Sequence, residues 1–326
     1  LVFNDTVLEN VTCHKHLGLN LSNNLKWTQH IDEILTKASK MLDVSMKFQH
    51  RLDRKSLETI YESFIRPKLE YGCQIWDDCN IQDKQRLENF QLRAARLVTG
   101  AKRGTSHELL YNELNWEKLE DRRKNVKILF MHKIVNNMLP EYLCELLPNK
   151  VGVNVNIQTR NSGNFKQLAI KSRRFQNSLL PDCIRMWNDL YKSIRDIVDF
   201  DLFKKNVLQE YNRMELYNYG ERTENTFHAQ LRLNCSNLNH HLFLLHVLDD
   251  PRCPCGHDIE NVHHFFFQCP LYVHNRHDLF ENVQQICNVT LNNLLYGSDD
   301  LSLDDNMKMF THVHKFIKLS KRFNVK

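Results

Sequence analysis

Three stretches of the chain between residues 28 and 100 place apolar side chains at helical spacing, and this pattern most constrains the fold. The first stripe comprises Ile31, Ile34, Leu35, Ala38, Leu42 and Met46, the second Leu57, Ile60, Tyr61, Phe64 and Ile65, and the third Leu87, Phe90, Ala94, Leu97 and Val98. Pro67 predicts a break or kink after the second stripe because proline lacks an N–H. Gly100 is a natural cap for the third. Helices with one apolar face bury these faces against one another, so we expect a small bundle.

The composition favours helices over turn-rich sheets, because only nine glycines and seven prolines occur among 326 residues. Strand signals are short. Leu17, Leu19 and Leu21 alternate with polar residues, which predicts a strand and a β-ribbon with a partner near residues 7–11. A similar alternation begins at Val153, and a turn at residues 161–164 would close a small hairpin. We therefore predict a mainly α fold, with roughly two domains on length alone.

A cluster of potential metal ligands lies near the C-terminus. Cys253 and Cys255 flank Pro254, His264 follows after eight residues, and Cys269 follows after four more. Three thiolates and one imidazole can close a tetrahedral, structural zinc site, although one residue between the first two cysteines is tighter than the usual spacing. Two alternatives stay open here. His263 could replace His264, or the residues could pack around the neighbouring phenylalanines without metal.

The remaining cysteines and the common enzyme motifs offer little chemistry. The other seven of the ten cysteines are scattered, and we expect them to be small core residues. Four protein ligands would leave a zinc ion no open position for water, so a catalytic zinc is not expected. The sequence has no His-x-Glu with Pro-Cys-x-x-Cys deaminase motif and no glycine-rich phosphate loop. No apolar stretch approaches the ~18 residues of a membrane span, so we expect no membrane partner.

The positive charge is concentrated in one region. The formal net charge is +5, and residues 82–133 carry twelve basic and seven acidic residues, so this region accounts for the whole excess. Such a region is the electrostatic signature of a phosphate-contacting surface. A solvated helical face would have the same composition.

Several sequence blocks together resemble one family. They are HKHLGLNLSNNLKWTQHI at residues 14–31, FIRPKLEYGCQIW at 64–76, LENFQLRAARLVTG at 87–100, LEDRRKNVKILFMHKIVNNMLPEYL at 119–143, RRFQNSLLPDCIRMWNDL at 173–190 and the Cys/His segment at 231–272. They resemble the post-catalytic part of reverse transcriptases from non-LTR retrotransposons, the jockey-like and LINE-like elements. The resemblance implies the end of the palm at residues 1–24, a helical thumb at 25–145, a connection at 146–217 and a zinc-binding, helical C-terminal module at 218–326.

The resemblance also implies a function. Such polymerases hold two Mg²⁺ ions on a Tyr/Phe-x-Asp-Asp turn, and none of the Asp-Asp pairs in this chain follows Tyr-x or Phe-x. The chain alone is therefore predicted to be inactive, with Mg²⁺ required only in the intact parent enzyme. It would grip the template–primer duplex and the element RNA beside upstream polymerase, and possibly endonuclease, domains of the same polyprotein. The predicted phosphate contacts are Arg93, Arg96, Lys102, Arg103, Arg122, Arg123 and Lys124.

The resemblance further implies an intracellular ribonucleoprotein, present in the nucleus and the cytoplasm. Two other functions remain compatible with the same residues. One is a stand-alone or domesticated zinc-containing RNA- or DNA-binding protein. The other is a protein-interaction scaffold with a zinc-stabilised end. Binding to an RNA–DNA hybrid at low salt would distinguish the nucleic-acid binders from the scaffold.

Overall fold

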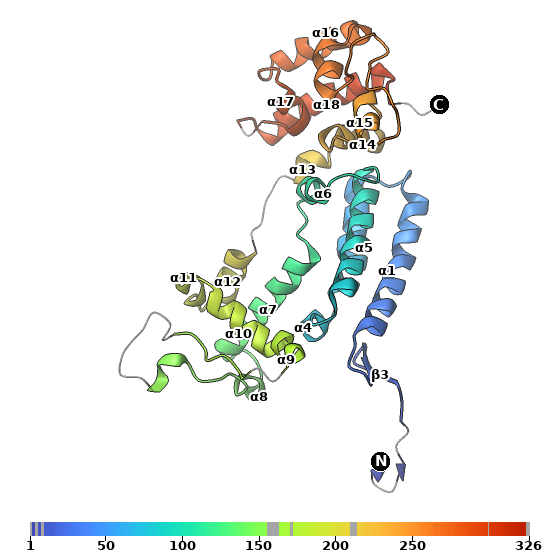
Figure 1. The fold of residues 1–326 in the computed structure, drawn as a ribbon. Helices are drawn as coiled ribbons and strands as arrows, with labels where there is room; N and C mark the ends of the chain where they lie inside the picture. The colour runs from blue at the N-terminus through green and yellow to red at the C-terminus, as the bar shows by residue number, and fades with distance from the viewer. Residues whose placement is uncertain are drawn as a thin grey trace. The chain divides into compact units, whose positions relative to one another are not determined.

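The protein is mainly helical, with short β-ribbons at its N-terminus, as the sequence predicts (Figure 1). The computed structural model describes residues 2–3, 6–7, 10–154, 163–169, 172–208, 214–298 and 300–323. Among the described residues, no helix is both long and apolar enough to cross a membrane.

The described strands form two antiparallel pairs. Strand β1 (Val2–Phe3) pairs with β2 (Thr6–Val7), and β3 (Cys13–His16) pairs with β4 (Leu19–Ser22). The predicted strand around Leu19 is therefore present, but its predicted partner near residues 7–11 is wrong. Its partner is β3, because a tight turn at Leu17 and Gly18 reverses the chain, and Gly18 adopts a φ of +83°.

The helices between residues 28 and 135 match the predicted stripes in most positions. Their bounds are α1 (Thr28–Phe48), α2 (Arg54–Ile60), a π-helical segment (Tyr61–Ile65), α3 (Arg66–Glu70), α4 (Cys73–Trp76), α5 (Ile81–Thr99), α6 (His107–Leu114) and α7 (Leu119–Val135). Ile31, Ala38 and Leu42 of α1 are buried, whereas Met46 is exposed. Helix α5 ends where predicted, with the N–H of Gly100 bonded to the carbonyl of Arg96 at 2.8 Å.

The π-helical segment explains why one predicted stripe residue is not buried. Pro67 cannot donate a backbone hydrogen bond, and the wider π turn ends at Ile65, two residues before it. Leu57, Tyr61 and Ile65 are buried at a spacing of four residues, whereas Phe64 is 55% exposed. The expected break at Pro67 therefore takes the form of a π turn, and Phe64 lies on the solvent side.

The chain divides into two compact units, each assembled from separate segments. The first unit comprises residues 1–38, 66–89 and 117–210, and the second comprises residues 39–65, 90–116 and 211–326. The thumb, connection and C-terminal module inferred from the family resemblance stay predictions.

The core of the first unit forms where α7 packs against α10 and α12. Its buried residues are Met131, Phe165, Cys183, Ile184, Trp187 and Phe203. The accompanying elements are α8 (Glu141–Cys144), a 3-10 turn (Val151–Asn154), α9 (Arg173–Asn177), α10 (Leu179–Asp189), α11 (Lys192–Arg195) and α12 (Phe200–Val207). Most of the predicted hairpin after residue 153 lies outside the described residues. Its flanks are joined by an antiparallel bridge between Lys150 and Phe165.

The core of the second unit is rich in aromatic side chains. Phe265, Phe266, Tyr272, Phe310 and Phe316 are buried there. These residues lie in a π turn, a 3-10 turn and α18. The helical elements of this part of the chain are α13 (Met214–Tyr217), α14 (Arg222–Arg232), α15 (Asn239–Leu244), the π turn (His264–Gln268), the 3-10 turn (Pro270–Tyr272), α16 (Val273–Gln284), α17 (Leu291–Tyr296) and α18 (Leu303–Ser320). Helix α18 contacts α14, α16 and α17, so it is the central helix of this core.

Candidate metal centre and basic residues

Two short backbone features position the four predicted metal ligands. A tight turn carries Cys253 and Cys255, with the N–H of Gly256 bonded to the carbonyl of Cys253 at 2.9 Å and Gly256 at a φ of +93°. The π turn that starts at His264 carries the other two ligands. The N–H of Cys269 is bonded to the carbonyl of His264 at 2.8 Å, which returns the chain by one wide turn. The gap of four residues between these ligands is therefore the length of that turn.

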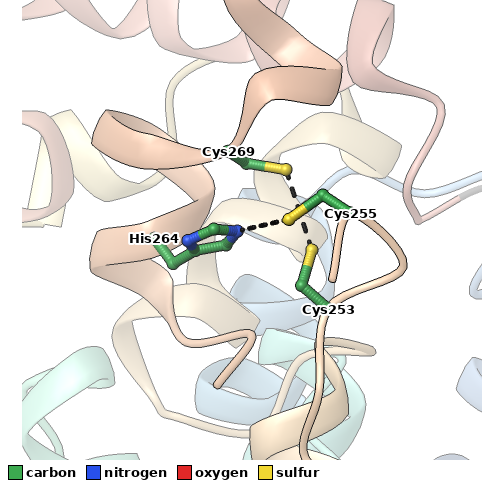
Figure 2. Close-up of side chains that lie close together, drawn as sticks. All are labelled: Cys253, Cys255, His264 and Cys269. Atoms are coloured by element: carbon green, nitrogen blue, oxygen red, sulfur yellow. Dashed lines mark hydrogen bonds between the residues drawn. The ribbon is translucent and has the colours of Figure 1, made fainter. Parts of the chain in front are cut away.

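The four side chains converge on one point (Figure 2). Cys255 Sγ lies 3.3 Å from His264 Nε2, Cys253 Sγ lies 3.7 Å from Cys269 Sγ, and all four ligand atoms lie within 4.8 Å of one another. Tetrahedral zinc with Zn–S of about 2.3 Å and Zn–N of about 2.0–2.1 Å places its ligand atoms roughly 3.5–3.8 Å apart. The donor set and its spacing therefore fit a structural zinc ion.

Burial shifts the pKa values of two of these ligands in opposite directions. It raises the pKa of the Cys253 thiol to about 12 and lowers the pKa of His264 below its usual value. A neutral imidazole is the form that binds metal, whereas a thiol must lose its proton. A divalent cation at this point would supply the charge that favours thiolates, so metal binding would release protons.

Side chains around the ligands hold them in place. Arg276 donates hydrogen bonds to the carbonyl of Phe266, in the middle of the π turn, and to the carbonyl of Cys269, directly after it. Glu260 is 1% exposed, lies 3.9 Å from Cys253 Sγ, and accepts hydrogen bonds of 2.7 and 2.6 Å from Arg322. Such outer contacts usually orient metal ligands. Sequence reasoning missed all three residues, because nothing in their spacing distinguishes them from surface charges.

The two candidate histidines occupy different environments. His264 is buried in the cluster and its ring stacks on His257 with ring centres 4.2 Å apart. His263 is exposed, and its ring stacks on Phe267 outside the cluster. Within the described residues, only the predicted set of Cys253, Cys255, His264 and Cys269 forms a group that could hold a metal ion.

The predicted phosphate contacts on the second unit differ in exposure. Arg93 and Arg103 are exposed, and neither forms an ion pair with a described residue, although Arg93 lies over the Phe90 ring at 5.7 Å. Arg96 is partly buried. Lys102 is partly buried and donates hydrogen bonds to the side chain of Asn237 and the carbonyl of Ser236. Arg93 and Arg103 are thus the residues of this group best placed to meet a phosphate.

The predicted contacts on the first unit are already paired with carboxylates. Arg122 binds Glu70, and Lys124 lies 3.1 Å from Glu120 and 3.0 Å from Asp121. Arg123 is 1% exposed and donates to Asp77 at 2.6 Å. A side chain with this burial does not reach a phosphate on the surface. The expectation for Arg123 is therefore corrected, and the residue is part of a buried ion-pair network.

That network was not predicted from the sequence. Lys127 is 2% exposed and donates hydrogen bonds to the carboxylates of Asp77 and Asp182. Nearby positive charges hold the pKa of Asp77 below its usual value although desolvation raises it. The network joins α4, α7 and α10 inside the first unit. The excess of basic residues in this region thus includes side chains that balance buried carboxylates.

The chain is related in sequence to the RNA-directed DNA polymerases of transposable elements. It is 27% identical over 103 residues to the probable RNA-directed DNA polymerase from transposon X-element of Drosophila melanogaster, which covers 31% of this chain and 11% of that protein. It is 24% identical over 168 residues to the RNA-directed DNA polymerase from mobile element jockey of the same organism, which covers 50% of this chain and 18% of that protein.

These matches confirm the relationship that the sequence blocks predict. The chain matches less than a fifth of the length of either relative. No protein-family model and no solved structure matches the chain.

Proposed function

We propose that this chain is a nucleic-acid-binding part of a retrotransposon RNA-directed DNA polymerase, which grips the template–primer duplex and the element RNA. The relationship to two such polymerases is the observation that supports this proposal most directly. In this setting the chain would work in a ribonucleoprotein of the nucleus and cytoplasm, beside the polymerase domain of the same polyprotein.

Arg93 and Arg103 are the phosphate-binding residues of the proposal, with Arg96 and Lys102 beside them in sequence. Arginine contacts to phosphates fix the register of a duplex without reading its bases, which is what a copying enzyme requires. Lys124 and Arg122 contribute less, because each would have to leave a carboxylate first.

Cys253, Cys255, His264 and Cys269 would hold a zinc ion in a structural role. When bound, the ion would stabilise the fold of the surrounding helices and leave no position for a reacting water. The four residues themselves connect the turn at Cys253 with the π turn before α16. The zinc site would therefore shape the second unit and take no part in chemistry.

Within the described residues, no group of carboxylates forms the two-metal arrangement that polymerases use. Asp77 is held by Arg123 and Lys127, and Asp78 accepts a hydrogen bond of 2.5 Å from Trp27. We expect the purified chain to give no RNA-templated DNA synthesis, and Mg²⁺ would act only in the intact parent enzyme. Incorporation of labelled nucleotides by residues 1–326 would contradict this.

The experiment that tests the proposal is the salt dependence of binding to an RNA–DNA hybrid. The affinity of the zinc-loaded chain should fall steeply with salt, since each phosphate contact releases counterions. The double variant R93E/R103E should bind more weakly and reduce the slope of log K against log salt by about two. The control K204E/K205E changes charge equally at exposed positions of α12 and should behave like the parent. Equal slopes for all three proteins would reject these contacts, and no binding at low salt would favour a protein-interaction scaffold.

A further inference from the structure

A cleft in the first unit is not used by the function proposed above. Its volume is about 390 Å³, which is within the range of roughly 300–1,000 Å³ common for ligand sites. The lining comes from the end of β4 and the following turn, from Asp78 after α4, and from α9 with its two flanking serines. The lining residues are Leu21, Ser22, Leu25, Lys26, Trp27, Asp78, Ser172, Arg174, Phe175 and Ser178.

Hydrogen bonds in the turn after β4 fix the backbone of two of these residues, Leu25 and Lys26. The side chain of Asn24 accepts a hydrogen bond from the N–H of Lys26 at 2.9 Å, and the N–H of Leu25 is bonded to the carbonyl of Ser22 at 2.9 Å. Leu25 adopts a φ of +56°, and its side chain is 66% exposed. A leucine in the left-handed region is strained, and such strain is concentrated at functional sites. The turn thus projects an apolar side chain and a cation beside the cleft.

The walls of the cleft are apolar and aromatic. Leu21 and Phe175 remain exposed although both are large and apolar. Trp27 is held by its hydrogen bond to Asp78, which fixes the orientation of the indole ring. Phe175 is placed by Ser172, whose hydroxyl accepts a hydrogen bond from the N–H of Phe175 at 3.1 Å. An oriented indole ring and an exposed phenyl ring can therefore meet a flat apolar ligand.

The charges around the cleft favour an anion with a polar edge. Lys26 and Arg174 are exposed, and neither forms an ion pair with any residue that the structure describes. Asp78 is the one carboxylate of the lining and is half-buried, so it can accept hydrogen bonds from the N–H groups of a ligand. A purely apolar ligand would leave Lys26 and Arg174 without an ion-pair partner and Asp78 with only its hydrogen bond from Trp27. A nucleotide satisfies all of them, since its base has a π face and N–H groups and its phosphate is anionic.

We propose that this cleft, the Trp27–Phe175 cleft, binds an unpaired nucleotide of single-stranded nucleic acid. The base would lie against the aromatic side chains with its edge toward Asp78, and the neighbouring phosphate would contact Lys26 and Arg174. Bases within a duplex are stacked and paired, so only an unpaired nucleotide can insert its base. The proposal rests on the nucleic-acid binding proposed above but assigns it a second site, distinct in residues from Arg93 and Arg103.

Binding of short labelled single-stranded oligonucleotides to the full, zinc-loaded chain tests the proposal. F175A should weaken binding roughly tenfold, because base–aromatic stacking contributes that order of affinity. The control Y191A removes another exposed aromatic side chain of the first unit and should bind like the parent. An oligonucleotide with abasic positions should bind the parent about as weakly as the intact one binds F175A. Separate RNA and DNA oligonucleotides would show which strand the cleft prefers.

The phosphate contact is tested by charge reversal. K26E should lower the affinity and reduce the salt slope by about one, whereas K192E, at another exposed lysine, should not. Far-ultraviolet circular dichroism would show that all variants fold. Equal affinity of F175A and Y191A for the oligonucleotide, or equal binding of intact and abasic oligonucleotides, would overturn the proposal. Both results are expected if the cleft binds an apolar peptide instead.

Binding of the same variants to an RNA–DNA hybrid duplex distinguishes failure of the cleft proposal from failure of the function proposed above. If the chain binds hybrid through Arg93 and Arg103 while F175A and K26E leave oligonucleotide binding unchanged, only the cleft is rejected. If the chain binds neither hybrid nor single strands, both proposals fall. Reduced oligonucleotide binding by F175A with unchanged hybrid binding is the result we expect.

Discussion

The metal cluster of the second unit and the ion-pair network of the first unit are both built from polar side chains removed from water, yet they differ in sequence range. The four candidate ligands lie between residues 253 and 269, and two local turns position them. The network connects Asp77, the pair Arg123 and Lys127 on α7, and Asp182, which come from three distant parts of the sequence. Local spacing therefore predicts the first arrangement, whereas the second depends on how the helices pack.

The largest effect should follow removal of the metal. H264A removes a ligand that is 2% exposed, whereas H263A removes the exposed ring beside it. We expect H264A, or a strong chelator added to the parent, to unfold most of the second unit, because structural zinc contributes on the order of 10 kcal/mol to folding. H263A should unfold like the parent. Elemental analysis would give the zinc content, and circular dichroism would follow thermal unfolding.

A result in which the chelator leaves the unfolding curve unchanged would mean that the cluster packs without metal. The aromatic core around Phe265 and Phe316 would then stabilise the unit alone. The Cys/His cluster and the ion-pair network would then both be stabilised by protein side chains alone, without a metal ion.

The second effect tests the ion-pair network. R123A removes one partner of the buried Asp77, and such changes typically cost about 3–5 kcal/mol. Lys127 still pairs with Asp77, so the lower end of this range is expected. K124A removes the next residue, whose side chain is exposed, and should cost less than about 1 kcal/mol. Urea unfolding of both variants measures the difference, and similar costs would show that Arg123 is not buried in solution.

The sequence predictions of the fold also succeeded where the determining residues are close in sequence and failed where they are distant. The helical stripes, the cap at Gly100 and the strand at Leu19 were predicted, because they depend on residues within a few positions of one another. The partner of that strand, the exposure of Phe64 and the burial of Arg123 were not. Each depends on a turn or a packing contact whose energy no single stretch of sequence determines. For the same reason composition identified a basic region but could not separate Arg93 from Arg123.

A smaller effect concerns pH and a neutral polar pair in the second unit. His228 donates through Nε2 to the carbonyl of Leu294 at 2.9 Å, and its Nδ1 lies 3.2 Å from His314 Nε2. Burial lowers the pKa of His228 well below its usual value and that of His314 to about 4, and Arg232 adds repulsion in both cases. Both rings are therefore neutral in the folded protein at neutral pH.

The sign of the pH effect follows from these shifts. In the unfolded chain both histidines bind protons below about pH 6.5, whereas in the folded protein His314 does not until about pH 4 and His228 resists protonation as well. The stability that they contribute is therefore complete above pH 6.5 and falls as the pH decreases. The loss approaches roughly 1.4 kcal/mol per pH unit for each histidine. Urea unfolding of the parent and of H314Q at pH 7 and 5.5 measures this loss of stability, expressed for each protein relative to its free energy of unfolding at pH 7. If H314Q loses as much stability between pH 7 and 5.5 as the parent does, His314 does not contribute to the pH dependence.

The smallest effect on stability is expected at Gly100, which caps α5 and also contacts a residue far away in the sequence. Gly100 was predicted as the cap of α5, and its φ of +71° agrees with that role. What the sequence did not indicate is that a Cβ at this position would press against Cγ2 of Thr226 on α14. G100A should therefore cost about 1 kcal/mol from backbone strain and a further amount from this contact. In the double variant G100A/T226A the contact disappears and the backbone term remains. If the coupling energy from urea unfolding is near zero, Thr226 rotates away freely, and Gly100 is needed for its backbone conformation alone.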